Sequence, residues 1–231
     1  MKAIEYINNL KKRVGSLYVY GAKQSVNYDR VTTRSDILKL QELYGDAYVW
    51  DTDLNKSGNT CCDCSGFIDY LFQKGYNSNM LYLYANDKIS IRTKNGNLDN
   101  KVLNTIPLGS VLWQAGHVGV FIGYIGNVAY YIAQDGSRAN CRIAKVSESG
   151  FTQALYNIKG YDIQYYMPQK FKVAKTTYAY TTNKAKIKKR KFIKGTTINA
   201  VARLNNYVLC RKYSYNQDCW VSVKDLIKLY N

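Results

Sequence analysis

The clearest hydrophobic pattern in the chain follows Cys64. The apolar side chains after it are Phe67, Ile68, Leu71 and Phe72. This i, i+3, i+4 spacing is typical of a helix with one buried face. Gly75 is a suitable residue to end such a helix. The pattern therefore predicts a buried helix that begins at Cys64.

Two more helices are predicted before this one. In the first, the apolar positions at helical spacing are Ile4, Ile7, Leu10 and Val14. In the second, Ser35 serves as the N-cap of a helix that runs to Tyr44 and closes at Gly45. Residues 46–62 look irregular, and residues 76–104 are too weakly patterned to assign an element.

From Ile106 onward the pattern changes to short β-strands separated by turn residues. The predicted strands are residues 110–113, 117–123, 128–134 and 141–146. Gly126 and Asn127 mark the turn between the second and third of these strands. Helices followed by an antiparallel meander predict an α+β domain over residues 1–167.

The last part of the chain reads as a second, smaller unit. Residues 168–175 are predicted to be a linker. Residues 176–231 alternate short runs of Val, Ile, Tyr and Thr with turn residues, which favours a small all-β barrel. Cys210 and Cys219 are placed to face each other across a hairpin, and we expect two free thiols because a chain made inside a cell stays reduced.

Charge separates the two units. The 231 residues carry a formal net charge of +17, and residues 170–231 contain 15 Lys and Arg residues against two acids, Asp218 and Asp225. This imbalance predicts a polyanionic partner for the C-terminal unit. We expect no membrane span, because no run of about 18 apolar residues occurs. We also expect no signal peptide, and hence synthesis in the cytoplasm with release by lysis or a dedicated export route.

Cys64 and His117 are the candidates for chemistry. The first turn of a helix favours a thiolate, although Cys64 alone fits a small buried apolar residue equally well. His117 is the single histidine in the sequence, so any imidazole base that works with Cys64 is His117. A zinc site is disfavoured because adjacent Cys61 and Cys62 lack the usual ligand spacing. We therefore expect no metal and no cofactor.

The surroundings of His117 suggest a third member of the site. Gly116 and Gly119 leave room for a ligand beside the imidazole. If a two-residue turn joins the strands, Gln134 is opposite or diagonal to His117, whereas a three-residue loop would put Asp135 there instead. A nucleophile, a base and an orienting group form the general pattern of nucleophilic catalysis.

These motifs together resemble the NlpC family of papain-like cell-wall cysteine peptidases. The matching segments are Asp63-Cys64-Ser65-Gly66-Phe67, Pro107 with Gly109, residues 116–123, and Tyr18-Val19-Tyr20-Gly21. The match covers roughly residues 10–165. Two features depart from the family pattern: 46 residues separate Tyr18 from Cys64, and Ser110 stands where an acid often follows the glycine.

The resemblance implies a role for each matching residue. It makes Cys64 the nucleophile, His117 the base and Gln134 the orienting residue. It also places Tyr18 beside the thiol and implies that Asp63 and Ser65 contact the substrate peptide. The family cleaves peptidoglycan stem peptides, often between γ-D-glutamate and the diamino acid, so peptidoglycan is the expected partner.

The C-terminal unit is similar, in fewer residues, to bacterial SH3-like modules that bind cell walls. The similar segments are Lys194-Gly195-Thr196 and Cys219-Trp220-Val221. Its positive charge fits anionic wall polymers. The basic run 184–194 would also suit nucleic acid. Because no recognisable nucleic-acid module occurs, no dedicated nucleic-acid partner is expected.

The leading interpretation of the whole chain is a phage-type peptidoglycan endopeptidase. The alternatives are an amidase of the related cysteine/histidine class, or a non-enzymatic protein that binds cell walls or nucleic acid.

Overall fold

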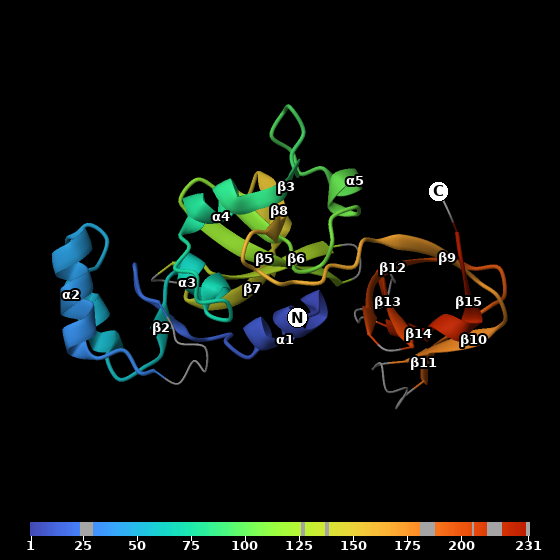
Figure 1. Ribbon diagram of the computed structural model, residues 1–231, viewed down its shortest axis with the longest axis horizontal. Helices are drawn as coiled ribbons and strands as arrows, with labels where there is room; N and C mark the ends of the chain where they lie inside the picture. The colour runs from blue at the N-terminus through green and yellow to red at the C-terminus, as the bar shows by residue number, and fades with distance from the viewer. Residues whose placement is uncertain are drawn as a thin grey trace.

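The computed structural model describes residues 1–23, 30–125, 128–136, 139–180, 188–204, 206–211 and 219–229. The chain forms two antiparallel sheets, with helices packed on the first of them (Figure 1). This confirms the predicted α+β class. No helix in the described part of the chain is long and apolar enough to cross a membrane.

The first sheet has six strands, all antiparallel. Their order across the sheet is β3 (Ala85–Ser90), β8 (Gln153–Ile158), β4 (Val111–Gln114), β5 (His117–Ile125), β6 (Val128–Gln134) and β7 (Cys141–Lys145). The four predicted strands correspond to β4 to β7, within one or two residues. Strand β3 lies in the segment where no element was predicted. It is an edge strand in which exposed side chains alternate with Ala85, Asp87 and Ile89, and only Ala85 of these is fully buried, so its sequence lacks a clear apolar face.

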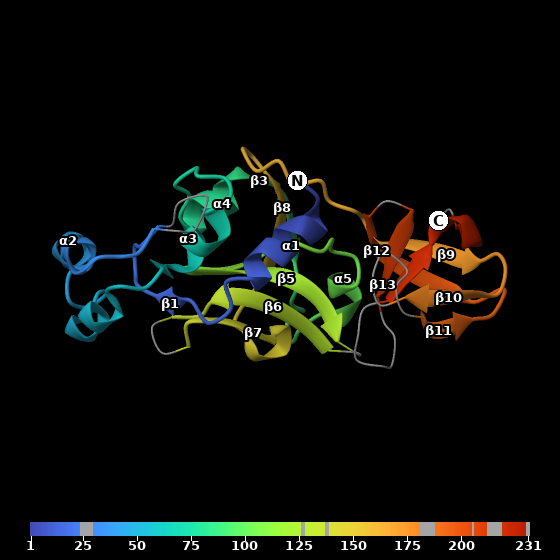
Figure 2. The same cartoon turned by 90° about the horizontal axis from the view of Figure 1, so that it is seen from below.

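Helices α1 (Ala3–Lys11) and α3 (Cys64–Asp69) supply the main apolar cover of this sheet (Figure 2). Every residue of α3 is buried, and the helix packs against β5 and β6. The helix ends at Asp69, six residues before the predicted end at Gly75. The Asp69 carboxylate accepts the backbone N–H groups of Lys74 and Gly75 and so closes the chain into a turn. The other helical elements of this unit are α4 (Ser78–Tyr84), α5 (Asn100–Leu103) and η2 (Val146–Glu148).

The segment between Tyr18 and Cys64 begins and ends at a separate two-stranded sheet. Strand β1 (Leu17–Tyr18) pairs in parallel with β2 (Cys61–Cys62), so the two ends of the segment lie side by side. Between them, α2 (Arg34–Tyr44) and η1 (Asp51–Lys56) form the lobe at one end of the molecule (Figure 1). This lobe has a small core of its own, made by Val19, Ala22, Ile37, Val49 and Cys61.

The N-cap of α2 differs from the prediction. Thr33, not Ser35, caps the helix: its Oγ1 accepts the backbone N–H of Asp36 at 3.1 Å, and the Asp36 carboxylate accepts the Thr33 N–H in return. This reciprocal pair is a capping box. Ser35 is a reasonable cap by residue type, but Thr33 has an acid three residues ahead, which completes the box.

The second sheet has seven strands. Their order is β11 (Lys188–Phe192), β10 (Thr177–Tyr180), β14 (Cys219–Ser222), β13 (Tyr207–Arg211), β12 (Thr197–Leu204), β9 (Gln169–Val173) and β15 (Leu226–Lys228), with η3 (Val223–Asp225) before the last. The outer strands β11 and β15 do not pair with each other among the described residues, so the described strands do not close the predicted barrel. The predicted linker is also partly wrong, because residues 169–173 form β9.

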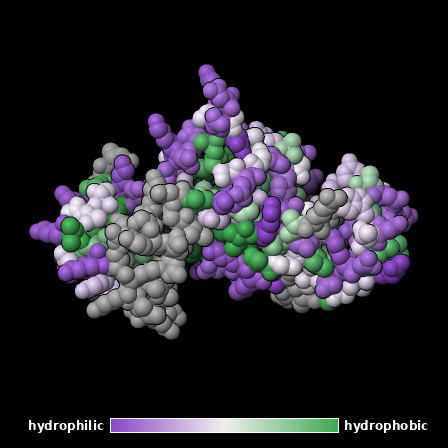
Figure 3. Space-filling model, turned by 180° about the vertical axis from the view of Figure 1, so that it is seen from behind, coloured by the Kyte–Doolittle hydropathy of each residue, from purple (hydrophilic) through white to green (hydrophobic). Residues whose placement is uncertain are grey.

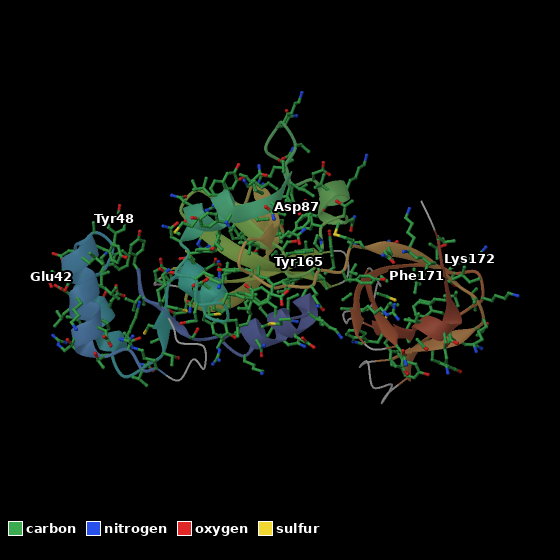
Figure 4. All side chains as sticks on the ribbon, in the orientation of Figure 1. Glu42, Tyr48, Asp87, Tyr165, Phe171 and Lys172 are labelled. Carbon is green, nitrogen blue, oxygen red and sulfur yellow. The ribbon has the colours of Figure 1, made fainter. Side chains whose placement is uncertain are left out.

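Side chains on β9 alternate, as expected of a strand with one buried face. Phe171 and Val173 are buried in the core of the second sheet, whereas Lys172 is exposed (Figure 4). Cys210 and Cys219 are direct partners across β13 and β14, as predicted, and both are free thiols in the structure.

The two sheets share apolar contacts. Val201, Ala202, Leu209 and Trp220 of the second sheet belong to the same buried cluster as the core of the first. A cavity of about 310 Å³ also lies between the two units, lined by residues of α1, of residues 164–166 and of β12. Separating the units would therefore expose apolar side chains of both.

Candidate active site

Cys64 is the first residue of α3. The preceding residue, Asp63, is the N-cap, and its carboxylate accepts the backbone N–H of Gly66. Cys64 is 7% exposed, so its thiol is nearly but not completely covered. Backbone N–H groups in the first turn of a helix have no partner within the helix and favour negative charge nearby. The thiol therefore lies where an oxyanion formed beside it is stabilised.

His117 is brought to Cys64 by a tight hairpin. Strands β4 and β5 are joined by Ala115 and Gly116, and His117 is the first residue of β5. Gly116 has a φ of 78°, a conformation that favours glycine. The Cys64 Sγ lies 4.0 Å from the Gly116 carbonyl oxygen. Because α3 packs on β5, the expected pair of Cys64 and His117 lies together in the structure, with the Cys64 sulfur against the residue before His117.

The third member of the site is Asp135. Its Oδ1 lies 3.0 Å from Nε2 of His117, which leaves Nδ1 of the imidazole for the Cys64 sulfur. The predicted contact between Gln134 and His117 is wrong. A β-bulge between Phe121 and Gly123 shifts the pairing of β5 and β6 by one residue, and this shift has the same effect as the three-residue loop that was predicted to favour Asp135.

Gln134 faces the opposite way and is fully buried. Its Nε2 donates to Ser16 Oγ at 2.8 Å, and it lies 3.3 Å from both the Leu17 carbonyl oxygen and the Cys62 Sγ. These contacts tie β6 to the chain just before β1. Gln134 therefore holds the strand that carries Tyr18 against the sheet, and it does not contact the imidazole.

Asp135 is held by two further donors. The Tyr131 hydroxyl donates to Oδ2 at 2.8 Å, and Nε of Arg142 donates to the same oxygen at 2.6 Å. Burial raises the pKa of Asp135, but the hydrogen bonds from His117, Arg142 and Tyr131 outweigh it, and the pKa is lowered overall. Asp135 is therefore a fixed carboxylate at neutral pH.

The same carboxylate decides the charge of His117. Burial alone lowers the pKa of the imidazole, but the hydrogen bond to Asp135 and the neighbouring Cys64 outweigh burial and raise the pKa from 6.5 to about 9. At neutral pH this favours an imidazolium next to the Cys64 sulfur. A neighbouring imidazolium favours the reactive form of a cysteine nucleophile.

Phe151 covers the imidazole. Its ring stacks on His117 with centroids 5.4 Å apart and an interplanar angle of 12°. A Cβ on Gly119 would lie 3.0 Å from both the Phe151 and Tyr131 rings. The space beside Gly119, predicted to admit a ligand, is therefore filled by these two aromatic side chains. Gly119 lets them close over the base and fix its plane.

Tyr18 lies close to the thiol, as expected. The pairing of β1 with β2 puts Tyr18 opposite Cys62, two residues before the nucleophile. Burial raises the pKa of the Tyr18 hydroxyl, and the charges of Cys64 and Asp63 raise it further. The phenol stays neutral, and it is a candidate hydrogen-bond donor beside the sulfur.

Asp63 and Ser65 flank the nucleophile but are occupied by another side chain. Nζ of Lys23 lies 2.9 Å from both carboxylate oxygens of Asp63 and 2.6 Å from Ser65 Oγ. Ser65 Oγ also donates to Asp63 at 2.9 Å. The two predicted substrate-binding residues therefore bind an ammonium group of their own chain.

Sequence reasoning missed several residues of this site: Tyr131, Arg142, Phe151 and Lys23. It considered Asp135 only for a longer loop. The sequence did contain one signal for Asp135, because Gly123 lies inside an apolar strand. In the structure Gly123 has a φ of 110°. A glycine within a strand often marks a bulge, and a bulge there puts Asp135 opposite His117.

The residues that the structure describes contain no group of three or more His, Cys, Asp or Glu side chains able to hold a metal ion. Comparison of the chain with protein-family models, with curated proteins and with solved structures found no match.

Proposed function

We propose that the protein is a cysteine peptidase that cleaves the stem peptides of peptidoglycan. The observation that carries this proposal is that Cys64 at the start of α3 lies against the hairpin that presents His117, whose Nε2 is 3.0 Å from Asp135 Oδ1. The nucleophile begins a buried helix, the base begins a strand, and the carboxylate directly follows the end of the next strand. This order and the helix-on-sheet packing are similar to the papain-like arrangement that the sequence motifs resemble.

In the proposed reaction, the Cys64 thiolate attacks the carbonyl carbon of the scissile amide. The developing oxyanion is stabilised by backbone N–H groups at the start of α3. The His117 imidazolium then gives its proton to the leaving amine, and a thioester remains on Cys64. The neutral imidazole next takes a proton from water, whose oxygen attacks the thioester, and the acid product leaves with the thiolate restored. Asp135 keeps the imidazole oriented through both steps.

The bond that is cleaved identifies the reaction. Purified peptidoglycan is digested with the full chain, and the fragments are sequenced by mass spectrometry. The proposal predicts new amino termini within the stem peptide, at a γ-D-glutamyl bond, and none with Cys64→Ala or His117→Ala. Cleavage between the sugar lactyl group and the first amino acid would instead favour the amidase alternative.

We further propose that the C-terminal unit binds anionic wall polymers, in the manner of the SH3-like modules it resembles. The support is its excess of Lys and Arg. Binding that depends on phosphate contacts weakens steeply as salt rises. Full-length Cys64→Ala protein is therefore expected to sediment with purified walls at low salt and to be released at high salt. Equal binding to duplex DNA across the same titration would mean that the charge is not specific for walls.

A further inference from the structure

A second feature of the molecule lies next to the site but outside the proposed reaction. A cavity of about 260 Å³ opens between the segment after β1 and helix α2 of the lobe. Its lining residues are Gly21, Ala22, Lys23, Arg30, Thr32, Asp36, Lys39 and Leu40. Three of these side chains are cationic and one is anionic.

The cavity adjoins the nucleophile through Lys23. Its Nζ bridges the Asp63 carboxylate and Ser65 Oγ, the side chains on either side of Cys64. The chain just before Lys23 is fixed to the same cap, because the Asp63 N–H donates to the Ala22 carbonyl oxygen at 2.9 Å. Lys23 therefore links the wall of the cavity to the two residues that flank the nucleophile.

The single acid of the cavity is already engaged. Asp36 accepts the backbone N–H of Thr33 at 2.9 Å and a hydrogen bond from Arg30 at 2.9 Å. The Thr33 hydrogen bonds outweigh desolvation and lower the pKa of Asp36, so it stays a carboxylate within its cap. Lys39 is exposed and forms no ion pair with any residue that the structure describes. The cavity therefore has positive charge left to offer a ligand.

Lys23 also changes what the flanking residues of the nucleophile can bind. Free Asp63 and Ser65 would suit an amine, because a carboxylate and a hydroxyl accept hydrogen bonds from it. With the Lys23 ammonium held on three of their oxygens, these two side chains are already occupied and its charge is offset by Asp63. The exposed Lys39 then supplies the positive charge that favours a negatively charged group by charge complementarity.

We propose that this cavity binds a free carboxylate of the substrate peptide next to the scissile bond. The proposal rests on the proposed peptidase function, and it adds the selection of acidic over amidated stem peptides. Purple and white atoms predominate over the lobe that forms one wall of the cavity (Figure 3), which agrees with a polar ligand. The lobe is the part of the chain that separates Tyr18 from Cys64, so the long insertion acquires a role in specificity.

The test uses two peptides that differ in one group: L-Ala-γ-D-Glu-L-Lys with its glutamate α-carboxylate free, and the same peptide with that group as a carboxamide. We expect full-length protein to cleave the free acid with a kcat/KM about tenfold above that of the amide, since partly exposed charge pairs contribute modestly. Lys39→Gln should reduce this ratio about threefold, and Lys39→Gln with Arg30→Gln should nearly abolish it. Lys94→Gln, an exposed lysine on a distant turn, is the matched control and should leave the ratio unchanged.

Equal cleavage of the two peptides by the wild-type protein would overturn the proposal while leaving the peptidase function intact. A loss of preference in Lys94→Gln as large as in Lys39→Gln would also overturn it, because the effect would then be one of net charge. If neither peptide is cleaved, the proposed function fails, and equilibrium binding of the same two peptides to the full-length protein tests the carboxylate-binding role of the cavity by itself. That role is supported if the acid binds more tightly than the amide and Lys39→Gln abolishes the difference. Equal binding of the two peptides, or no binding, would contradict it.

Discussion

The Nε2 atom of the His117 imidazole, at the start of β5, lies 3.0 Å from Oδ1 of the Asp135 carboxylate, which directly follows β6. Asp135→Asn keeps the shape of this contact but removes its charge. Loss of an orienting carboxylate next to a catalytic imidazole lowers turnover by about 10²- to 10⁴-fold. We therefore expect a loss of that order in kcat for wall hydrolysis, with an unchanged circular dichroism spectrum. A variant as active as wild type would show that Asp135 has no role in orienting His117.

The same substitution should move the pH dependence of the reaction. The His117 pKa is raised from 6.5 to about 9, so the imidazolium is present at neutral pH and is lost as pH rises through about 9. Without the Asp135 charge the pKa falls, and the alkaline limb of kcat/KM shifts to lower pH. The raised pKa also stabilises the fold, fully below pH 6.5 and progressively less as pH rises to about 9. An alkaline limb at the same pH in Asp135→Asn would contradict this account.

Gln134→Ala separates structure from chemistry. Gln134 is fully buried and donates to Ser16 Oγ, so its removal leaves buried polar groups without a partner. Such a loss costs about 1–3 kcal/mol of unfolding free energy. We expect a lower midpoint in urea denaturation, but a kcat per folded molecule within about threefold of wild type. A collapse of kcat without loss of stability would restore Gln134 as the orienting residue.

Gly119→Ala tests the covering of the base. The added Cβ would lie 3.0 Å from the Phe151 and Tyr131 rings, so the aromatic side chains must move away from His117. Overpacking of this kind costs about 1–3 kcal/mol, and we expect lower stability together with lower activity. The double variant Gly119→Ala/Phe151→Leu should recover part of the stability, because a smaller side chain relieves the overlap. No difference between the single and double variants would show that Phe151 does not press on this position.

Because Lys23 already occupies Asp63 and Ser65, we expect the kcat/KM of the protein not to depend on whether the substrate has a free amino terminus. Acetylating that terminus removes a positive charge that those two side chains would otherwise bind. Because the Lys23 ammonium already lies 2.6–2.9 Å from their oxygens, we expect acetylated and free peptides to be cleaved with similar kcat/KM. A strong preference for the free amine would mean that Lys23 is displaced during binding.

Much of the fold was predictable from local sequence signals. The strands β4 to β7 are marked by alternating apolar residues and Gly or Asn turns, and α3 is marked by its buried face. Strand β3 was not predicted, since only Ala85 among its side chains is fully buried. Strand β9 falls within the predicted linker, although Phe171 and Val173 show the period of two.

The site was predictable in its two main residues but not in its third. Cys64 and His117 follow from a helix start and from a single histidine. The choice between Gln134 and Asp135 depends on one bulged residue near Gly123, which flips the face of every residue after it. The occupation of Asp63 by Lys23 depends on tertiary folding across 40 residues. Neither relationship has a periodic signature in the sequence.

The central claim is that Cys64 is the nucleophile of a peptidase, and one measurement tests it most directly. The rate at which new amino groups appear in purified peptidoglycan is compared for wild-type protein and for Cys64→Ala, with circular dichroism to verify that both are folded. We predict hydrolysis by the wild type and a rate at least about 10³-fold lower for the variant. A folded Cys64→Ala protein that releases amino groups as fast as the wild type would contradict the claim.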